Sequence, residues 1–179
     1  IQVYTQHEQA GSWSIGGLIG EASHTEIADC FYQGNISLTA LDGNVSAGGL
    51  VGASYYGEIN KSYMTGSLSI TGTRGYVGGL AGVLSSTPAE NCFVNSLIFR
   101  EKIPLSESGE KNHTAGFLGI GFNVSLTGCY AAAAVKTEEE TAFGFYGADE
   151  QDKGYKEVFS NCYYDLDKSC LGCLWVGVL

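Results

Sequence analysis

A short glycine-rich block recurs five times along this chain of 179 residues and limits the choice of fold more than any other feature. Three copies follow the pattern Gly-Gly-Leu-x-Gly and two are degraded; together they span 16–20, 48–52, 78–82, 115–119 and 143–147. The second position of the block is always glycine, at 17, 49, 79, 116 and 144, so the steps are 32, 30, 37 and 28 residues. A period in this range indicates stacked units, none of which can bury its apolar face alone.

Other residue types recur in register with the glycines. A cysteine or serine followed by an aromatic residue comes thirteen residues after the second glycine in four copies and eighteen after it in the fifth: Cys30-Phe31, Ser62-Tyr63, Cys92-Phe93, Cys129-Tyr130 and Cys162-Tyr163. Apolar residues fill two more columns, at Ile27, Ile59, Ala89, Leu126 and Phe159 and at Ile36, Leu68, Ile98 and Val135. We expect equivalent positions to lie above one another.

Strands, rather than helices, are the expected elements of each unit. Apolar and polar residues alternate over 36–39 and 68–71, and this period of two is typical of strands. The alanines and glutamates of 131–140 suit a helix, but their place in the repeat favours a strand running into a loop. The sequence therefore predicts an all-β fold, a parallel β-helix of about five coils of roughly 30 residues with about three strands per coil. Parallel crossovers favour a right-handed coil.

The stacking hypothesis assigns a place to each column. The aromatic column should form a ring stack, the cysteine column should face inward, and the core should be filled by Leu18, Leu50, Leu80, Phe117 and Phe145. Two polar insertions, Arg100–Asn112 and Ala148–Glu157, are expected to leave the solenoid as loops, where binding usually resides. The domain prediction is a lead-in or cap over 1–14, the repeats over 15–165, and a cap or link over 166–179.

Charge and hydropathy exclude some classes of partner. The formal charge is −10, from 9 basic and 19 acidic residues, which argues against nucleic acid and against an anionic membrane surface. The apolar run Cys170–Leu179 is too short to span a bilayer, and Ile1–Tyr4 does not resemble a signal peptide, so membrane insertion is not expected. We expect a monomeric module that belongs to a larger chain.

No residue pattern indicates catalysis or metal binding. His7, His24 and His113 form no His-Glu-x-x-His motif, and Asp29 aligns with Lys61, Asn91, Gly128 and Asn161 rather than with a column of carboxylates. Cys30, Cys92, Cys129 and Cys162 are expected to be free thiols, whereas Cys170 and Cys173 suit a local disulfide or terminal packing better than zinc.

Two further patterns keep alternatives open. Asp149, Glu150 and Asp152, or Asp165 and Asp167, could hold a structural calcium ion, although a solvated charge run is the favoured interpretation. Asparagines of Asn-x-Ser/Thr sequences would carry glycans only in a eukaryotic protein; they are Asn35, Asn44, Asn60, Asn112 and Asn123. We assign no catalytic, cofactor-binding or metal residue, and the binding residues stay unassigned.

The block Gly48–Gly52 followed by an Ile-x-x-Ser-Tyr segment at 59–63 resembles the GLUG motif of large bacterial surface proteins. Asn161–Asp165 looks like the close of such an array, so the resemblance runs from about residue 15 to 165 and is weakest in the last two units. It implies an extracellular module of the kind found in adhesin-like proteins and in the immunoglobulin A1 metalloprotease family.

The expected function is that of a non-catalytic spacer or adhesion scaffold of a surface or secreted protein, with a host or surface protein or a glycan as partner. Tyr55, Tyr56 and Tyr76 could contribute contacts, although corner packing is the favoured role. The alternatives are an accessory substrate-holding domain of a large peptidase and a carbohydrate-binding or carbohydrate-active β-helix.

Overall fold

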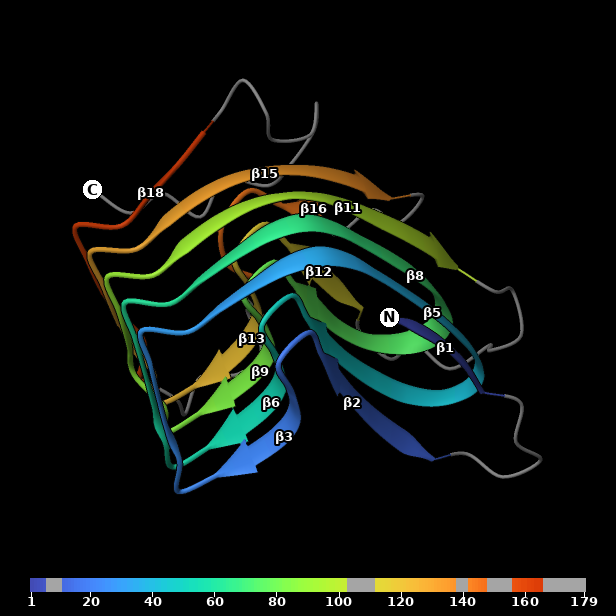
Figure 1. The fold of residues 1–179 in the computed structure, drawn as a ribbon, viewed down its shortest axis with the longest axis horizontal. Helices are drawn as coiled ribbons and strands as arrows, with labels where there is room; N and C mark the ends of the chain where they lie inside the picture. The colour runs from blue at the N-terminus through green and yellow to red at the C-terminus, as the bar shows by residue number, and fades with distance from the viewer. Residues whose placement is uncertain (6–10, 103–111, 138–141, 148–155, 166–179) are drawn as a thin grey trace.

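The structure is a computed structural model that describes residues 1–5, 11–102, 112–137, 142–147 and 156–165. These residues form strands, turns and bends and contain no helix. Every strand pairing among them is parallel, and the chain winds as a β-solenoid (Figure 1). The predicted all-β parallel β-helix is confirmed.

Three parallel sheets form the walls of the solenoid. The largest consists of β1 (Gln2–Thr5), β2 (Ser12–Gly16), β5 (Phe31–Gly48), β8 (Tyr63–Gly78), β11 (Phe93–Lys102), β12 (His113–Ala115), β15 (Tyr130–Thr137), β16 (Ala142–Phe143) and β18 (Tyr163–Tyr164). A second sheet consists of β3 (Ile19–Ser23), β6 (Val51–Tyr55), β9 (Ala81–Ser85) and β13 (Leu118–Phe122). The third consists of β4 (Glu26–Ala28), β7 (Glu58–Asn60), β10 (Ala89–Glu90), β14 (Ser125–Thr127) and β17 (Val158–Ser160).

One turn of the solenoid contains four extended segments rather than the predicted three. After a glycine corner the chain runs through a strand of the second sheet, a short strand of the third, and then a long strand of the largest sheet. The long strands β5 and β8 curve onward beyond Ala40 and Gly72 and lead directly into the next glycine corner (Figure 1). The five glycine blocks thus lie at corners, between strands, and delimit four complete turns.

The predicted columns are confirmed by the strand register. The aromatic positions pair in the order Phe31, Tyr63, Phe93, Tyr130 and Tyr163. The two apolar columns pair as Ile27, Ile59, Ala89, Leu126 and Phe159 and as Ile36, Leu68, Ile98 and Val135. The segment 131–137 is a strand in β15, as its place in the repeat predicted.

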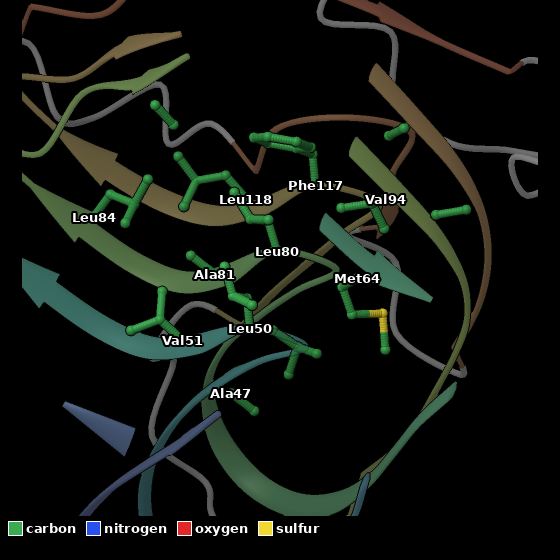
Figure 2. Close-up of a cluster of buried hydrophobic side chains, with 14 of the residues drawn as sticks. Ala47, Leu50, Val51, Met64, Leu80, Ala81, Leu84, Val94, Phe117 and Leu118 are labelled. Carbon is green, nitrogen blue, oxygen red and sulfur yellow. The ribbon is translucent and has the colours of Figure 1, made fainter. Parts of the chain in front are cut away.

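The core is a continuous column of apolar side chains between the sheets (Figure 2). Leu50, Leu80 and Phe117 are fully buried, and the ring of Phe117 stacks on that of Phe145 at 4.7 Å between centroids. The prediction is wrong for Leu18, which occupies the same position in the first coil but is 45 % exposed. Among the described residues no coil lies on its outer side, so Leu18 is covered on one side only.

The glycine corners leave no room for a side chain. A Cβ built on Gly49 would lie 2.3 Å from the carbonyl oxygen of Gly79 and 2.3 Å from Cγ of Met64. The equivalent Gly79 and Gly116 have the same conflict with the carbonyl oxygen of the next coil, each at 2.1 Å. Close approach of successive backbones therefore explains why this position is glycine in every copy.

Arg100 is not the start of a displayed loop, as the sequence suggested, but an interior residue that is 2 % exposed. Its guanidinium donates to the carbonyl oxygen of Gly75 at 3.0 Å and to Oδ1 of Asn112 at 3.1 Å. The same Oδ1 accepts the Gly75 N–H at 2.8 Å. Arg100 and Asn112 thus satisfy backbone groups of the coil below, because the insertion interrupts the regular ladder there. Residues 103–111 and 148–155 of the two insertions lie outside the described residues.

Candidate functional site

The aromatic column lies on the outer surface of the largest sheet. Phe31 and Tyr63 stack at 5.1 Å with 7° between their planes, and Phe93 and Tyr130 stack at 5.6 Å with 8°. Because the rings lie face to face, mainly their edges are presented to solvent. The predicted ring stack is confirmed for these two pairs, and it forms an apolar stripe along the solenoid.

Each turn has two corners at which a residue adopts the left-handed backbone conformation. One corner comes before the short strand of the third sheet and the other comes after it. One column of such residues consists of His24, Tyr56, Ser86 and Asn123, and the other of Asp29, Lys61, Asn91, Gly128 and Asn161. The second is the column that the sequence showed to lack a carboxylate ladder. The Asn, Asp and Gly residues of this column are the sequence signal for positive φ, because these residue types adopt it more readily than others.

A hydroxyl or thiol follows the left-handed residue in every copy of the second corner. In each case the side chain donates to the carbonyl oxygen two residues earlier: Cys30 to Ala28, Ser62 to Asn60, Cys92 to Glu90, Cys129 to Thr127 and Cys162 to Ser160. Ser62 Oγ also accepts the N–H of Cys30 in the preceding coil at 3.1 Å. Serine can stand at one position of this cysteine column because a hydroxyl and a thiol can both donate this bond.

Cys92, Cys129 and Cys162 form a buried file of thiols, and with Cys30 all are free, as predicted. A hydrogen bond from Cys129 lowers the pKa of Cys92 despite its burial. At Cys129 the bond with Cys162 acts to lower the pKa, but the bond with Cys92 and burial outweigh it and raise the pKa to about 12. The bond with Cys129, and then burial, raise the pKa of Cys162 as well. Burial and mutual bonding fit a packing role for this file.

The histidines within the described residues lie apart and contact aromatic rings. His113 is buried, lies edge-on to Tyr76 and Phe143, and has Nδ1 3.3 Å from the carbonyl oxygen of Gly147. His24 stacks on Tyr56 at 5.4 Å. His7 lies outside the described residues.

The three tyrosines considered for binding have different environments. Tyr55 and Tyr76 pack on a small apolar cluster of Ala53, Val83 and Ile120, and burial, followed by the charge of Glu21, raises the pKa of Tyr55. Tyr56, by contrast, is 62 % exposed. A packing role therefore describes Tyr55 and Tyr76, whereas Tyr56 stands at a left-handed corner, stacks on His24 and keeps most of its ring exposed.

A hollow of about 430 Å³ opens on the outer face of the largest sheet, near the ends of β8, β11 and β15. Its outward-facing lining includes Ser69, Thr71, Phe99, Glu101 and Lys136. The ammonium of Lys136 lies 5.6 Å from the centroid of the Phe99 ring, within the range of a cation–π contact. No sequence motif marks this hollow.

The calcium hypothesis is not tested by the structure. Asp165 is described, whereas Asp149, Glu150, Asp152 and Asp167 lie outside the described residues, as do Cys170 and Cys173. Within the described ranges no three His, Cys, Asp or Glu side chains are grouped so that they could hold a metal ion. A shallow hollow beside Glu26, Asp29 and Glu90 is lined by carboxylates, but it also contains Lys61.

Comparison with protein-family models, with curated proteins and with solved structures gives no match to this chain. The GLUG resemblance thus stays a prediction from the repeat pattern. Within the part of the chain that the structure describes, no helix is long and apolar enough to cross a membrane.

Proposed function

We propose that this chain is a rigid, non-catalytic scaffold of a bacterial surface or secreted protein, which holds a regular outer face available for adhesion. One observation carries the proposal: the parallel ladder continues through every described coil, from β3 to β13 in one sheet and from β4 to β17 in another. Glycine corners and left-handed corners repeat in register with it. An array of this kind resists bending because each coil is bonded to both neighbours.

The outer surface supports a binding role more than a purely mechanical one. Three aromatic rings lie outside the core and expose large apolar areas: Phe31, Tyr63 and Tyr163. Exposed aromatic side chains are enriched where proteins contact partners. The extracellular setting rests on the GLUG resemblance.

Two measurements on the purified chain test the proposal. Stretching single molecules between handles should give unfolding steps at high force, as expected for a laddered solenoid. Beads coated with the folded chain should adhere to host-cell surfaces, whereas beads coated with a Gly79→Val chain, which cannot close its corner, should not. Smooth extension like a random coil would contradict the scaffold, and adhesion equal to that of the Gly79→Val chain would contradict the binding role.

A further inference from the structure

The hollow over Phe99 points to a ligand of particular chemistry. We infer that it is a binding site for a neutral carbohydrate, an inference that rests on the proposed binding role of this face. The site lies where β8, β11 and β15 run side by side on the largest sheet (Figure 1).

Phe99 is the unusual member of its column. The strand register places Ser37, Ser69 and Lys136 at the equivalent outward positions of the neighbouring coils. The ladder therefore does not stack this ring on another ring, in contrast to Phe31 or Phe93. Phe99 remains 38 % exposed, and the ammonium of Lys136 lies on the side of the next coil. On the other side stands the small side chain of Ser69, which leaves space against the ring.

Four polar side chains around the ring form no side-chain hydrogen bond or ion pair with the part of the chain that the structure describes: Ser69, Thr71, Glu101 and Lys136. Ser67, one position along the same face, differs because its hydroxyl donates to Oδ1 of Asn35 at 2.8 Å. The hollow thus offers two hydroxyls, one carboxylate acceptor and one ammonium donor around an apolar surface.

This combination matches the chemistry of a pyranose. A sugar ring presents carbon-bound hydrogens on one face, which pack on an aromatic ring, and hydroxyls at its rim, which both donate and accept hydrogen bonds. Glu101 can accept from such hydroxyls, Lys136 can donate to them, and Ser69 and Thr71 can do either. A volume of about 430 Å³ lies in the range of small-molecule sites.

Charge and topology select among possible ligands. The chain carries a net charge of −10 and Glu101 lines the hollow, so sialylated or uronate-rich glycans are disfavoured. An extended peptide usually binds to an open sheet edge through backbone hydrogen bonds. Ser69 and Phe99, however, are paired on both sides within the sheet, so their backbones offer no such edge.

The row of small side chains suggests how a longer glycan would lie. Ser37 and Thr39 of β5 continue the row of Ser69 and Thr71 toward the first coil. Neighbouring strands are about 4.8 Å apart, close to the length of one sugar unit in a chain. A linear oligosaccharide could therefore run along the solenoid axis from Phe99 over these hydroxyls.

The test is a panel of immobilised oligosaccharides probed with the full chain, followed by calorimetry on the best ligand. We expect binding of neutral glucose-, galactose- or mannose-containing oligomers, and saturation transfer from aromatic protons to the bound sugar. Phe99→Ala should weaken binding about tenfold. Glu101→Gln should also weaken it, because the amide is a poorer acceptor.

Two exposed residues elsewhere give matched controls. Leu18→Ala removes an exposed apolar side chain, and Glu58→Gln an exposed carboxylate, that do not line the hollow, so neither should change the affinity. If no neutral glycan binds, or if Phe99→Ala binds as well as Leu18→Ala, the inference is overturned. Selective binding of a protein or peptide through Phe99 would also overturn it, while leaving the proposed scaffold in place. Loss of bead adhesion together with retained glycan binding would count against the adhesive role alone.

Discussion

At the scale of single residues, close approach of backbones decides what the repeat tolerates. Gly49→Ala should cost about 3 kcal/mol or more, because the new Cβ would meet the carbonyl oxygen of Gly79 at 2.3 Å. Gly72→Ala is the matched control, since its nearest neighbour, the carbonyl oxygen of Ala40, lies at an ordinary 3.4 Å. That variant should be neutral or more stable by up to about 1 kcal/mol, because alanine restricts the unfolded chain. Urea unfolding of the two variants checks this, and equal effects would contradict it.

The left-handed corners give a second prediction for a single side chain. Lys61 is exposed and has φ 45°, in a column that otherwise contains Asp, Asn and Gly. Lys61→Asn should raise the free energy of unfolding by a few tenths to about 1 kcal/mol, since asparagine adopts this conformation more readily. Lys61→Val should lower it by about 1–2 kcal/mol. A thermal melting series on the three proteins measures both, and a rise for valine would contradict the conformational explanation.

At the scale of elements, the corner after each short strand depends on one side-chain donor. Ser62 Oγ donates to the carbonyl oxygen of Asn60 at 2.7 Å and accepts the N–H of Cys30 at 3.1 Å. Ser62→Ala leaves both groups without this partner and should cost about 1–3 kcal/mol. Ser62→Cys should cost less, because a thiol makes the same bond at four other corners. Chemical denaturation should rank the proteins as wild type, then cysteine, then alanine; alanine ranking above cysteine would refute the bonding role.

The file of thiols predicts how stability changes at alkaline pH. Cys129 and Cys162 have pKa values raised above the ordinary value of 9.0, so the folded chain keeps protons that the unfolded chain releases. Stability should therefore fall as the pH rises from 9 toward 12, in part offset by Cys92, whose lowered pKa acts in the opposite sense. Serine does not titrate in this range, so a Cys129→Ser/Cys162→Ser variant should lose less stability between pH 8 and 10.5. The measurement is the urea midpoint of the unmodified chain and of this variant as a function of pH, under reducing conditions. The same pH dependence in both proteins would rule out a link between thiol ionisation and stability.

Some features of the strands and corners could be predicted from the sequence, and others could not. Columns such as Phe31 and Tyr63 were predictable because parallel coils place equivalent positions side by side. The burial of Arg100 was not, because it compensates for a local interruption that the repeat pattern does not encode. The hollow at Phe99 was likewise hidden, since it arises from differences between neighbouring coils rather than from what they share. The left-handed corners are signalled in the sequence by residues such as Asn91, because asparagine tolerates positive φ.

At the scale of the whole molecule, stability depends on position along the axis. Each coil gains its burial from the coils above and below, so the contributions resemble a sum of nearest-neighbour terms. A coil in the middle is covered on both sides, whereas the first described coil is covered on one. Residues of the same type in the same column should consequently contribute more to stability in a middle coil than in the first described coil.

Leu18 and Leu50 provide the comparison, because both follow the paired glycines of their blocks. Leu50 is fully buried and Leu18 is 45 % exposed. Leu50→Ala should lower the free energy of unfolding by about 2–5 kcal/mol through lost burial and a residual cavity, whereas Leu18→Ala should lower it by less than about 1 kcal/mol. Hydrogen exchange on the unmodified chain should agree, with β3 less protected than β6 and β9, because a coil covered on one side opens more readily. Equal losses of unfolding free energy in the two alanine variants would contradict this explanation, because they would mean that Leu18 is covered as completely as Leu50.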